Sequence, residues 1–120
     1  MQFAAYFSIA VGAGMMIQWA LSYFNGQIPE LKTEPVRIAF HIAGEMVTAL
    51  MLIAGGIGVL LASQWGVIIF LIGAGMLIYT AIVSPGYFAQ QGKWAWVLIF
   101  AVIITVMILA ILKVSQAIAT

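Results

Sequence analysis

Residues 36–61 read VRIAFHIAGEMVTALMLIAGGIGVLL, and this stretch decides the fold of the chain. It exceeds the ~20 apolar residues with which an α-helix crosses the ~30 Å hydrocarbon core of a bilayer. Three further apolar runs are near or above that length, namely Phe3–Phe24, Trp65–Val83 and Trp94–Leu112. The sequence therefore predicts an all-α integral membrane protein, a single four-helix up-down bundle over residues 1–120.

The composition indicates that lipid is the solvent of most side chains. Of the 120 residues, 66% are hydrophobic and 6% are charged, whereas a soluble domain carries ~25% charged residues. A net charge of +1 without a basic cluster argues against nucleic acid as a partner. The absence of cysteine excludes disulfides and thiol chemistry, and a single histidine does not supply a zinc site within one chain. The composition thus favours a protein that is not an enzyme and holds no metal.

Two prolines mark connections between the helices. Pro35 suits the first turn of a helix, where its missing N–H is not needed. Pro85 is expected to push Ser84 out of helical geometry and so to end the third helix at Val83. The aromatic-rich segment 84–93 is then expected to be an interfacial turn, or alternatively a docking surface.

Basic residues predict the orientation in the membrane. Lys32, Arg37 and Lys93 flank the first and third connections, and only Lys113 lies towards the side that holds both termini. The positive-inside rule places those two connections in the cytoplasm and the termini outside. Because the bias is three against one, insertion of the same chain in both orientations stays open.

A weak internal repeat relates the first and third apolar runs. Residues 12–17 read GAGMMI and residues 73–78 read GAGMLI. Duplicated hairpins would give two halves related by an axis along the membrane normal, as in some transporters. The alternative is that Gly, Ala, Met and Ile are simply abundant in this chain.

A polar stripe on the second apolar run provides the candidate site. Arg37, His41 and Glu45 are spaced by four residues and Thr48 follows by three, so all four share one helix face. A charge near a bilayer centre costs at least ~2.5 kcal/mol, so an intramembrane carboxylate is a functional-site hypothesis by default. The stripe predicts a proton- or ion-exchanging path from the interface to Glu45. Alternatively, Glu45 only hydrogen-bonds a neighbouring helix, which is typically worth ~0.6 to ~2 kcal/mol.

Polar residues on two other runs are expected at the same depth. Gln18 lies on the first run with Ser22 one turn later, and Tyr79 lies on the third run beside Thr80. The three helices could therefore share a polar pocket. Hydrogen bonding between helices is the simpler interpretation of Gln18 and an equal one for Tyr79.

Glycines at helical spacing predict close helix packing. Small residues one turn apart let two helices approach each other, as in Ser8-x-x-x-Gly12 and Ala54-x-x-x-Gly58. The glycines expected at such contacts are Gly12, Gly14, Gly55, Gly58, Gly73 and Gly75. A flexible gate is the alternative for the dense cluster at residues 55–58.

Three segments carry a family resemblance. They are FHIAGEMVTA at residues 40–49, GGIG at residues 55–58 and SPGY at residues 84–87, and they resemble small four-helix prokaryotic membrane proteins of uncharacterised function. A fainter similarity connects the chain to the DoxX-like group, which also has an acidic residue at the start of a Gly- and Leu-rich second helix. The resemblance implies a multi-pass protein of a prokaryotic cytoplasmic (inner) membrane, and its DoxX-like part implies a redox or quinone-linked role.

Two functions from different classes follow. The first is a homo-oligomeric proton- or ion-coupled transporter or ion pathway, without a cofactor, in which Glu45 is the coupling acid and His41 a relay. The second is an accessory or redox subunit of a larger membrane complex, where haem or quinone becomes a possible cofactor. Both place the chain in a lipid bilayer, with either a second copy or a membrane-complex subunit as its partner.

Overall fold

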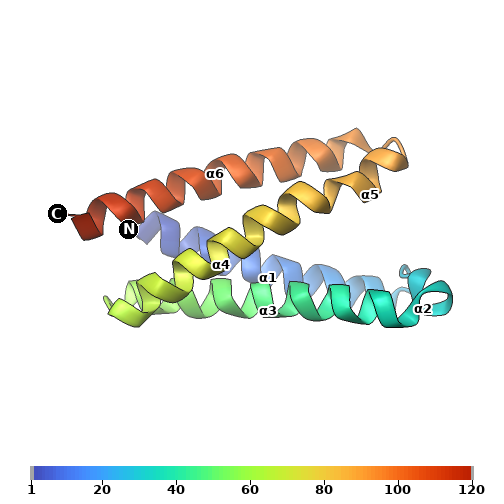
Figure 1. Cartoon of the computed structure of the whole chain (residues 1–120), viewed down its shortest axis with the longest axis horizontal. Helices are drawn as coiled ribbons and strands as arrows, with labels where there is room; N and C mark the ends of the chain where they lie inside the picture. Colours follow the sequence, from blue (N-terminus) through green and yellow to red (C-terminus); the bar gives the residue numbers. More distant parts are fainter. Residues whose placement is uncertain (1, 120) are drawn as a thin grey trace.

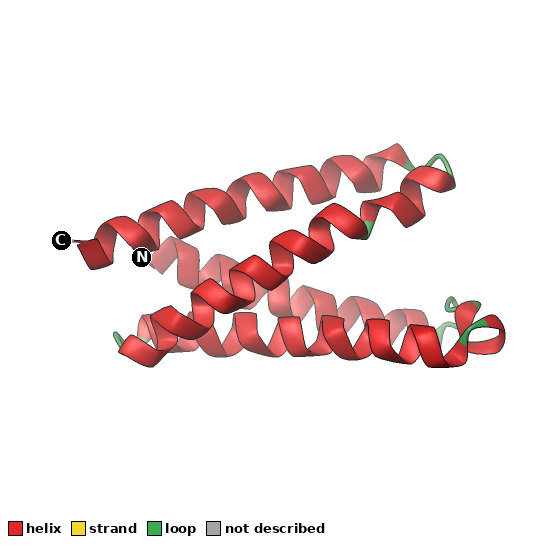
Figure 2. Cartoon of the chain, viewed as in Figure 1, coloured by secondary structure: helices red, strands yellow, loops and turns green. Residues whose placement is uncertain are grey.

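The computed structural model describes residues 2–119, and these residues form helices joined by short connections, without a strand (Figure 2). Four helices are long, and two short ones lie in the connections. The order is α1 (Gln2–Phe24), α2 (Glu30–Thr33), α3 (Pro35–Leu60), α4 (Gln64–Val83), α5 (Pro85–Gln90) and α6 (Trp94–Ala119). Four helical segments are long and apolar enough to cross a membrane, with α4 and α5 forming one of them. The predicted all-helical fold with four candidate spans is confirmed.

Successive long helices run in opposite directions (Figure 1). Both termini lie at the end of the molecule that holds the α3–α4 connection, and α2 and α5 lie at the other end. Helix α3 is central, because α1 and α4 each pack along it, whereas α6 packs less extensively, against α4, α5 and α1. At the end that holds α2 and α5, the α4–α6 pair separates from α3.

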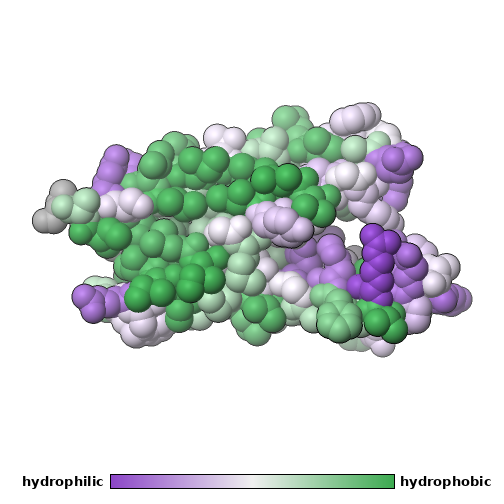
Figure 3. Space-filling view, in the orientation of Figure 1, coloured by the Kyte–Doolittle hydropathy of each residue, from purple (hydrophilic) through white to green (hydrophobic). Residues whose placement is uncertain are grey.

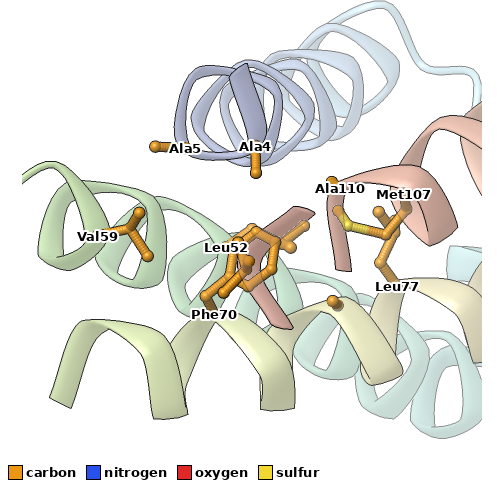
Figure 4. Packing of buried hydrophobic residues seen from close by; sticks show 10 residues of the cluster. Ala4, Ala5, Leu52, Val59, Phe70, Leu77, Met107 and Ala110 are labelled. Atoms are coloured by element: carbon orange, nitrogen blue, oxygen red, sulfur yellow. The ribbon is translucent and has the colours of Figure 1, made fainter. Parts of the chain in front are cut away.

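The apolar core lies where the four long helices meet (Figure 4). Leu52 of α3 and Phe70 of α4 are fully buried at its centre. Small residues of α1 and side chains of α6 close it on two sides, namely Ala4, Ala5, Met107 and Ala110. A buried hydroxyl also joins α1 to α3, because Ser8 Oγ donates a hydrogen bond of 2.6 Å to the carbonyl oxygen of Leu52.

Glycines of α3 bring its backbone against α4. A Cβ atom at Gly58 would collide with the Cα atom of Gly66 and lie 2.9 Å from Cζ3 of Trp65. One turn earlier, a Cβ atom at Gly55 would lie 2.5 Å from the backbone nitrogen of Phe70. These glycines therefore sit at the closest crossing in the fold, as small residues at a helix interface allow.

The two GAGM segments, one on α1 and one on α4, contact the same stretch of α3. A Cβ atom at Gly12 would lie 2.7 Å from the carbonyl oxygen of Ala49, and one at Gly73 would lie 3.2 Å from the backbone nitrogen of Leu52. By contrast, a Cβ atom at Gly14 or Gly75 would meet nothing within 4 Å. Gly14 and Gly75 therefore face open space in the single chain, and their expected packing role stays a prediction.

The connections differ from expectation in holding the short helices α2 and α5, the latter in place of the expected turn, and in the conformation of Ser84. Pro35 occupies the first turn of α3, and α4 ends at Val83, as predicted. However, Ser84 keeps helical backbone angles, with φ −63° and ψ −35°, so the expectation that Pro85 excludes them is wrong. Pro85 begins α5 directly, where its missing N–H leaves no helix bond unmade.

The last helix is longer than expected. It continues to Ala119, beyond the anticipated end at Leu112. Residues 113–119 read KVSQAIA and contain neither Gly nor Pro, so nothing in them breaks a helix. Lys113 is accordingly a helical residue rather than part of a tail.

Candidate functional site

Glu45 lies at the interface between α3 and α4, and its side chain is the most buried carboxylate of the chain. The residue is 8% exposed, and it is the eleventh residue of α3, ~15 Å along the helix from Pro35 at ~1.5 Å rise per residue. Thr80 of α4 donates a hydrogen bond from Oγ1 to Oε1 of Glu45. The carboxyl group therefore connects two of the long helices.

His41 shares the same carboxylate oxygen. Its Nε2 atom lies 3.7 Å from Oε1 of Glu45, one helical turn away on the same face of α3. The imidazole ring also makes an edge-on contact with Trp19 of α1, with ring centroids 5.7 Å apart. Because the His41 side chain is 43% exposed, the imidazole bridges the buried carboxyl group and the surface.

A second polar connection leads from Glu45 along α4. Oγ1 of Thr80 lies 3.2 Å from Oγ of Ser84, within hydrogen-bond distance. Ser84 stands at the junction of α4 and α5, so the Glu45–Thr80–Ser84 chain points towards the same end of the molecule as His41. Glu45 thus has two polar neighbours, namely His41 on its own helix and Thr80 on α4.

His41, Glu45 and Thr80 line a groove between α3 and α4, which we call the acidic groove. Its volume is about 590 Å³, within the usual size of small-molecule sites. Its walls are formed by Phe40, His41, Gly44, Glu45, Thr48, Gly75, Met76, Tyr79, Thr80 and Val83. In Figure 3, hydrophilic residues gather in the hollow between the two arms at the α2–α5 end, whereas the opposite half of this face is mostly hydrophobic.

The other residues predicted for the site occupy different places. Thr48 and Tyr79 line the acidic groove, but Oγ1 of Thr48 donates 2.8 Å to the carbonyl oxygen of Gly44 in its own helix. Gln18 is exposed on α1 and does not line the groove. Arg37 forms an ion pair with Glu34 at 3.2 Å, on the exposed first turn of α3. The structure therefore joins His41 and Glu45, places Thr48 and Tyr79 beside them, and leaves Gln18 and Arg37 apart.

Thr80, the hydrogen-bond partner of Glu45, was expected from the sequence only as a polar neighbour of Tyr79. Tyr79 lines the groove, but Thr80 makes the contact, and Ser84 extends it. Thr80 and Ser84 are spaced by four residues near the end of the third apolar run, and this spacing was the available signal. Trp19, the aromatic partner of His41, carried no comparable signal in an aromatic-rich chain.

The site offers proton-exchanging groups rather than a metal centre. Within residues 2–119, no three His, Cys, Asp or Glu side chains come together to hold a metal ion. A carboxyl group, an imidazole and two hydroxyls at hydrogen-bond or near distance can accept, hold and pass on a proton. The arrangement is a short polar path between α3 and α4 that leads from Glu45 towards the α2–α5 end.

Comparison with known proteins identifies a family. No curated protein and no solved structure shows a significant match to the chain. One family model covers residues 1–119, which agrees with the expected uncharacterised family and leaves the DoxX-like similarity a hypothesis. The chain belongs to the family described as the domain of unknown function DUF8058.

Proposed function

We propose that this protein is a proton- or ion-coupled transporter or ion pathway of a cell membrane, with Glu45 as the coupling acid and His41 as its relay. The observation that carries the proposal is the position of Glu45, which is buried between two apolar helices yet touches both an imidazole and a hydroxyl. Ionisable side chains in membrane helices are rare, and they commonly mark proton or ion paths.

The polar neighbours of Glu45 connect it to one end of the molecule. His41 is partly exposed towards the α2–α5 end, and Ser84 stands at the same end. In the other half, the backbones of α3 and α4 touch at Gly58 and Gly66, and Phe70 packs against Gly55. Protons therefore reach Glu45 from the α2–α5 end, which is the cytoplasmic end if Lys32, Arg37 and Lys93 set the orientation.

Passage to the opposite side requires more than one chain. The acidic groove has walls from α3 and α4 and is open along one side. The four long helices pack around an apolar core that leaves no polar route through residues 2–119, so we propose that a second copy supplies the missing wall of the groove. Homo-oligomerisation is thus part of the proposal.

Proton flux into liposomes tests the proposal. The purified protein is reconstituted with a pH-sensitive dye inside the vesicles, and acidification is followed after a proton gradient is imposed. Glu45→Gln should abolish the protein-dependent flux because it keeps the shape of the side chain but removes the exchangeable proton. Glu30→Gln is the matched control, since Glu30 lies in α2 outside the groove. Wild-type flux in a correctly inserted Glu45→Gln protein would disprove the role of Glu45.

A redox accessory subunit is the second candidate. The acidic groove carries two aromatic side chains, Phe40 and Tyr79, on opposite helices, and a flat ring could lie between them. A quinone would fit this description, with Glu45 or His41 as a hydrogen-bond partner. Extraction of the protein from its own membrane in mild detergent, followed by native mass spectrometry, distinguishes the two candidates. A bound quinone, haem or larger subunit favours the redox role, and a cofactor-free homo-oligomer favours transport.

A further inference from the structure

We infer that the acidic groove binds a hydrophobic monovalent cation, such as a quaternary ammonium or phosphonium ion with bulky apolar substituents. The inference deepens the proposed function by naming a substrate class, and it rests on that function only in placing the groove within a membrane. Four observations carry it: the free oxygen of Glu45, the aromatic walls, the open space at two glycines and the absence of Lys and Arg from the described groove lining.

One carboxylate oxygen of Glu45 faces the groove. Oε1 accepts the hydrogen bond of Thr80 and lies near His41. Oε2 has no hydrogen-bond partner within residues 2–119. Every fully buried side-chain oxygen or nitrogen atom in that region does have a partner. Oε2 must therefore retain contact with the surroundings, and Glu45 does so at the groove wall. A carboxylate oxygen in this position is an unsatisfied acceptor that attracts positive charge.

Two aromatic side chains line the same groove from different helices. Phe40 of α3 is 77% exposed and Tyr79 of α4 is 70% exposed, although both line the groove. The face of an aromatic ring attracts a cation by ~0.5–2 kcal/mol, and most strongly where water is excluded. Aromatic walls and one carboxylate together suit a cation that is itself hydrophobic.

Two glycines keep the groove wide beside Glu45. Gly44 of α3 and Gly75 of α4 both line it, and a Cβ atom at either position would meet nothing within 4 Å. Larger side chains at these positions would occupy the groove rather than a helix contact. The open volume therefore lies next to the carboxyl group, where a bulky ion needs it.

The charges nearby favour a large cation over an anion or a small metal ion. No Lys or Arg lines the groove, and Arg37 is paired with Glu34 outside it. The titratable side chains at the groove are His41 and Glu45 of α3 and Tyr79 of α4. A small cation such as Ca²⁺ takes six to eight oxygen ligands, typically. The groove offers one carboxylate and the hydroxyls of Thr48, Tyr79 and Thr80, which are fewer oxygen ligands than such an ion takes.

Binding of tetraphenylphosphonium tests the inference. The full-length chain in detergent is equilibrated with this cation, and bound probe is measured by equilibrium dialysis. Tetraphenylborate, an anion of the same shape, reports partition into the micelle and onto apolar surfaces. We expect saturable binding of the phosphonium ion that falls at least tenfold in Glu45→Gln and in Gly75→Leu. Glu30→Gln and Gly14→Leu are matched controls outside the groove, the latter because Gly14 also faces open space, and both should bind as the wild type does.

The results separate the inference from the proposed function. Equal binding of the anion, or unchanged phosphonium binding in both Glu45→Gln and Gly75→Leu, would overturn the inference. If Glu45→Gln does not fold, as judged by gel filtration, Gly75→Leu alone decides, because its new side chain points into free space. Saturable binding without proton flux in liposomes would support the groove as a cation site and reject proton coupling. Proton flux without phosphonium binding would reject the cation site and keep the proton path.

Discussion

Gly58 of α3 and Gly66 of α4 meet backbone to backbone, so that neither position has room for a Cβ atom. We predict that Gly58→Ala lowers the free energy of unfolding by ~1–3 kcal/mol, the usual cost of forcing extra atoms into a packed contact. Unfolding in a detergent titration, followed by circular dichroism, measures the change. Gly14→Ala is the control, because its added methyl group meets nothing within 4 Å. Equal stability of the two variants would contradict the close contact.

Thr80 should be required for the stability and the activity of the Glu45 site. Thr80→Val keeps the size of the side chain but removes the hydroxyl that donates to Glu45 and contacts Ser84. Hydrogen bonds to charged groups contribute ~1.5–3 kcal/mol, so both stability and proton flux should fall, whereas Thr80→Ser should restore most of each. Thr105→Val is a suitable control, because that hydroxyl is exposed and bonds only the Ala101 carbonyl of its own helix. A Thr80→Val protein with unchanged flux would show that the contact is only structural.

His41 should be required for flux but not for folding. His41→Phe keeps an aromatic ring beside Trp19 and removes the nitrogen atoms that exchange protons. General acid–base groups typically contribute ~10²–10⁴-fold to proton-transfer rates, so flux in liposomes should fall at least tenfold while insertion and thermal unfolding change little. Retained flux would mean that protons reach Glu45 through Thr80 and Ser84 instead, and the double variant with Thr80→Val would then abolish flux.

Arg37 should be dispensable. Its guanidinium is paired with Glu34 on the exposed first turn of α3 rather than with His41 or Glu45. Exposed ion pairs contribute ~0–1 kcal/mol, so Arg37→Gln should leave both stability and proton flux nearly unchanged. Liposome flux at two salt concentrations measures this. A large loss of flux at both concentrations would restore Arg37 to the proton path that its spacing suggested.

The presence of four long helices was predictable, because it depends on the length of the apolar runs in the sequence. The run at residues 36–61 became α3, and the glycines at 55 and 58 became its contact with α4. The apolar runs did not predict which face of each helix meets its neighbour. Gly12 and Gly14 are two residues apart in the same motif, but only Gly12 faces α3, and periodicity alone does not say which face of α1 meets another helix.

The candidate site was predictable along one helix and not across two. The four-residue spacing correctly placed His41 beside Glu45, because that relationship is internal to α3. The choice between Tyr79 and Thr80 depended on the rotation of α4 about its axis, which is set by the contacts at Gly66 and Gly73. For the same reason, the sequence did not reveal that Gly75 lines the groove beside Glu45.

The glycine crossing also determines how the groove can move. Gly58 and Glu45 lie on the same helix, ~20 Å apart at ~1.5 Å rise per residue. The backbones of α3 and α4 also approach each other at Gly55 and at Gly73, so their close contact extends from Gly58 to Leu52. Leu52 is about 10 Å from Glu45 at ~1.5 Å rise per residue. Any widening of the groove is therefore confined to this last stretch of α3, and it has to break the hydrogen bond between Thr80 and Glu45.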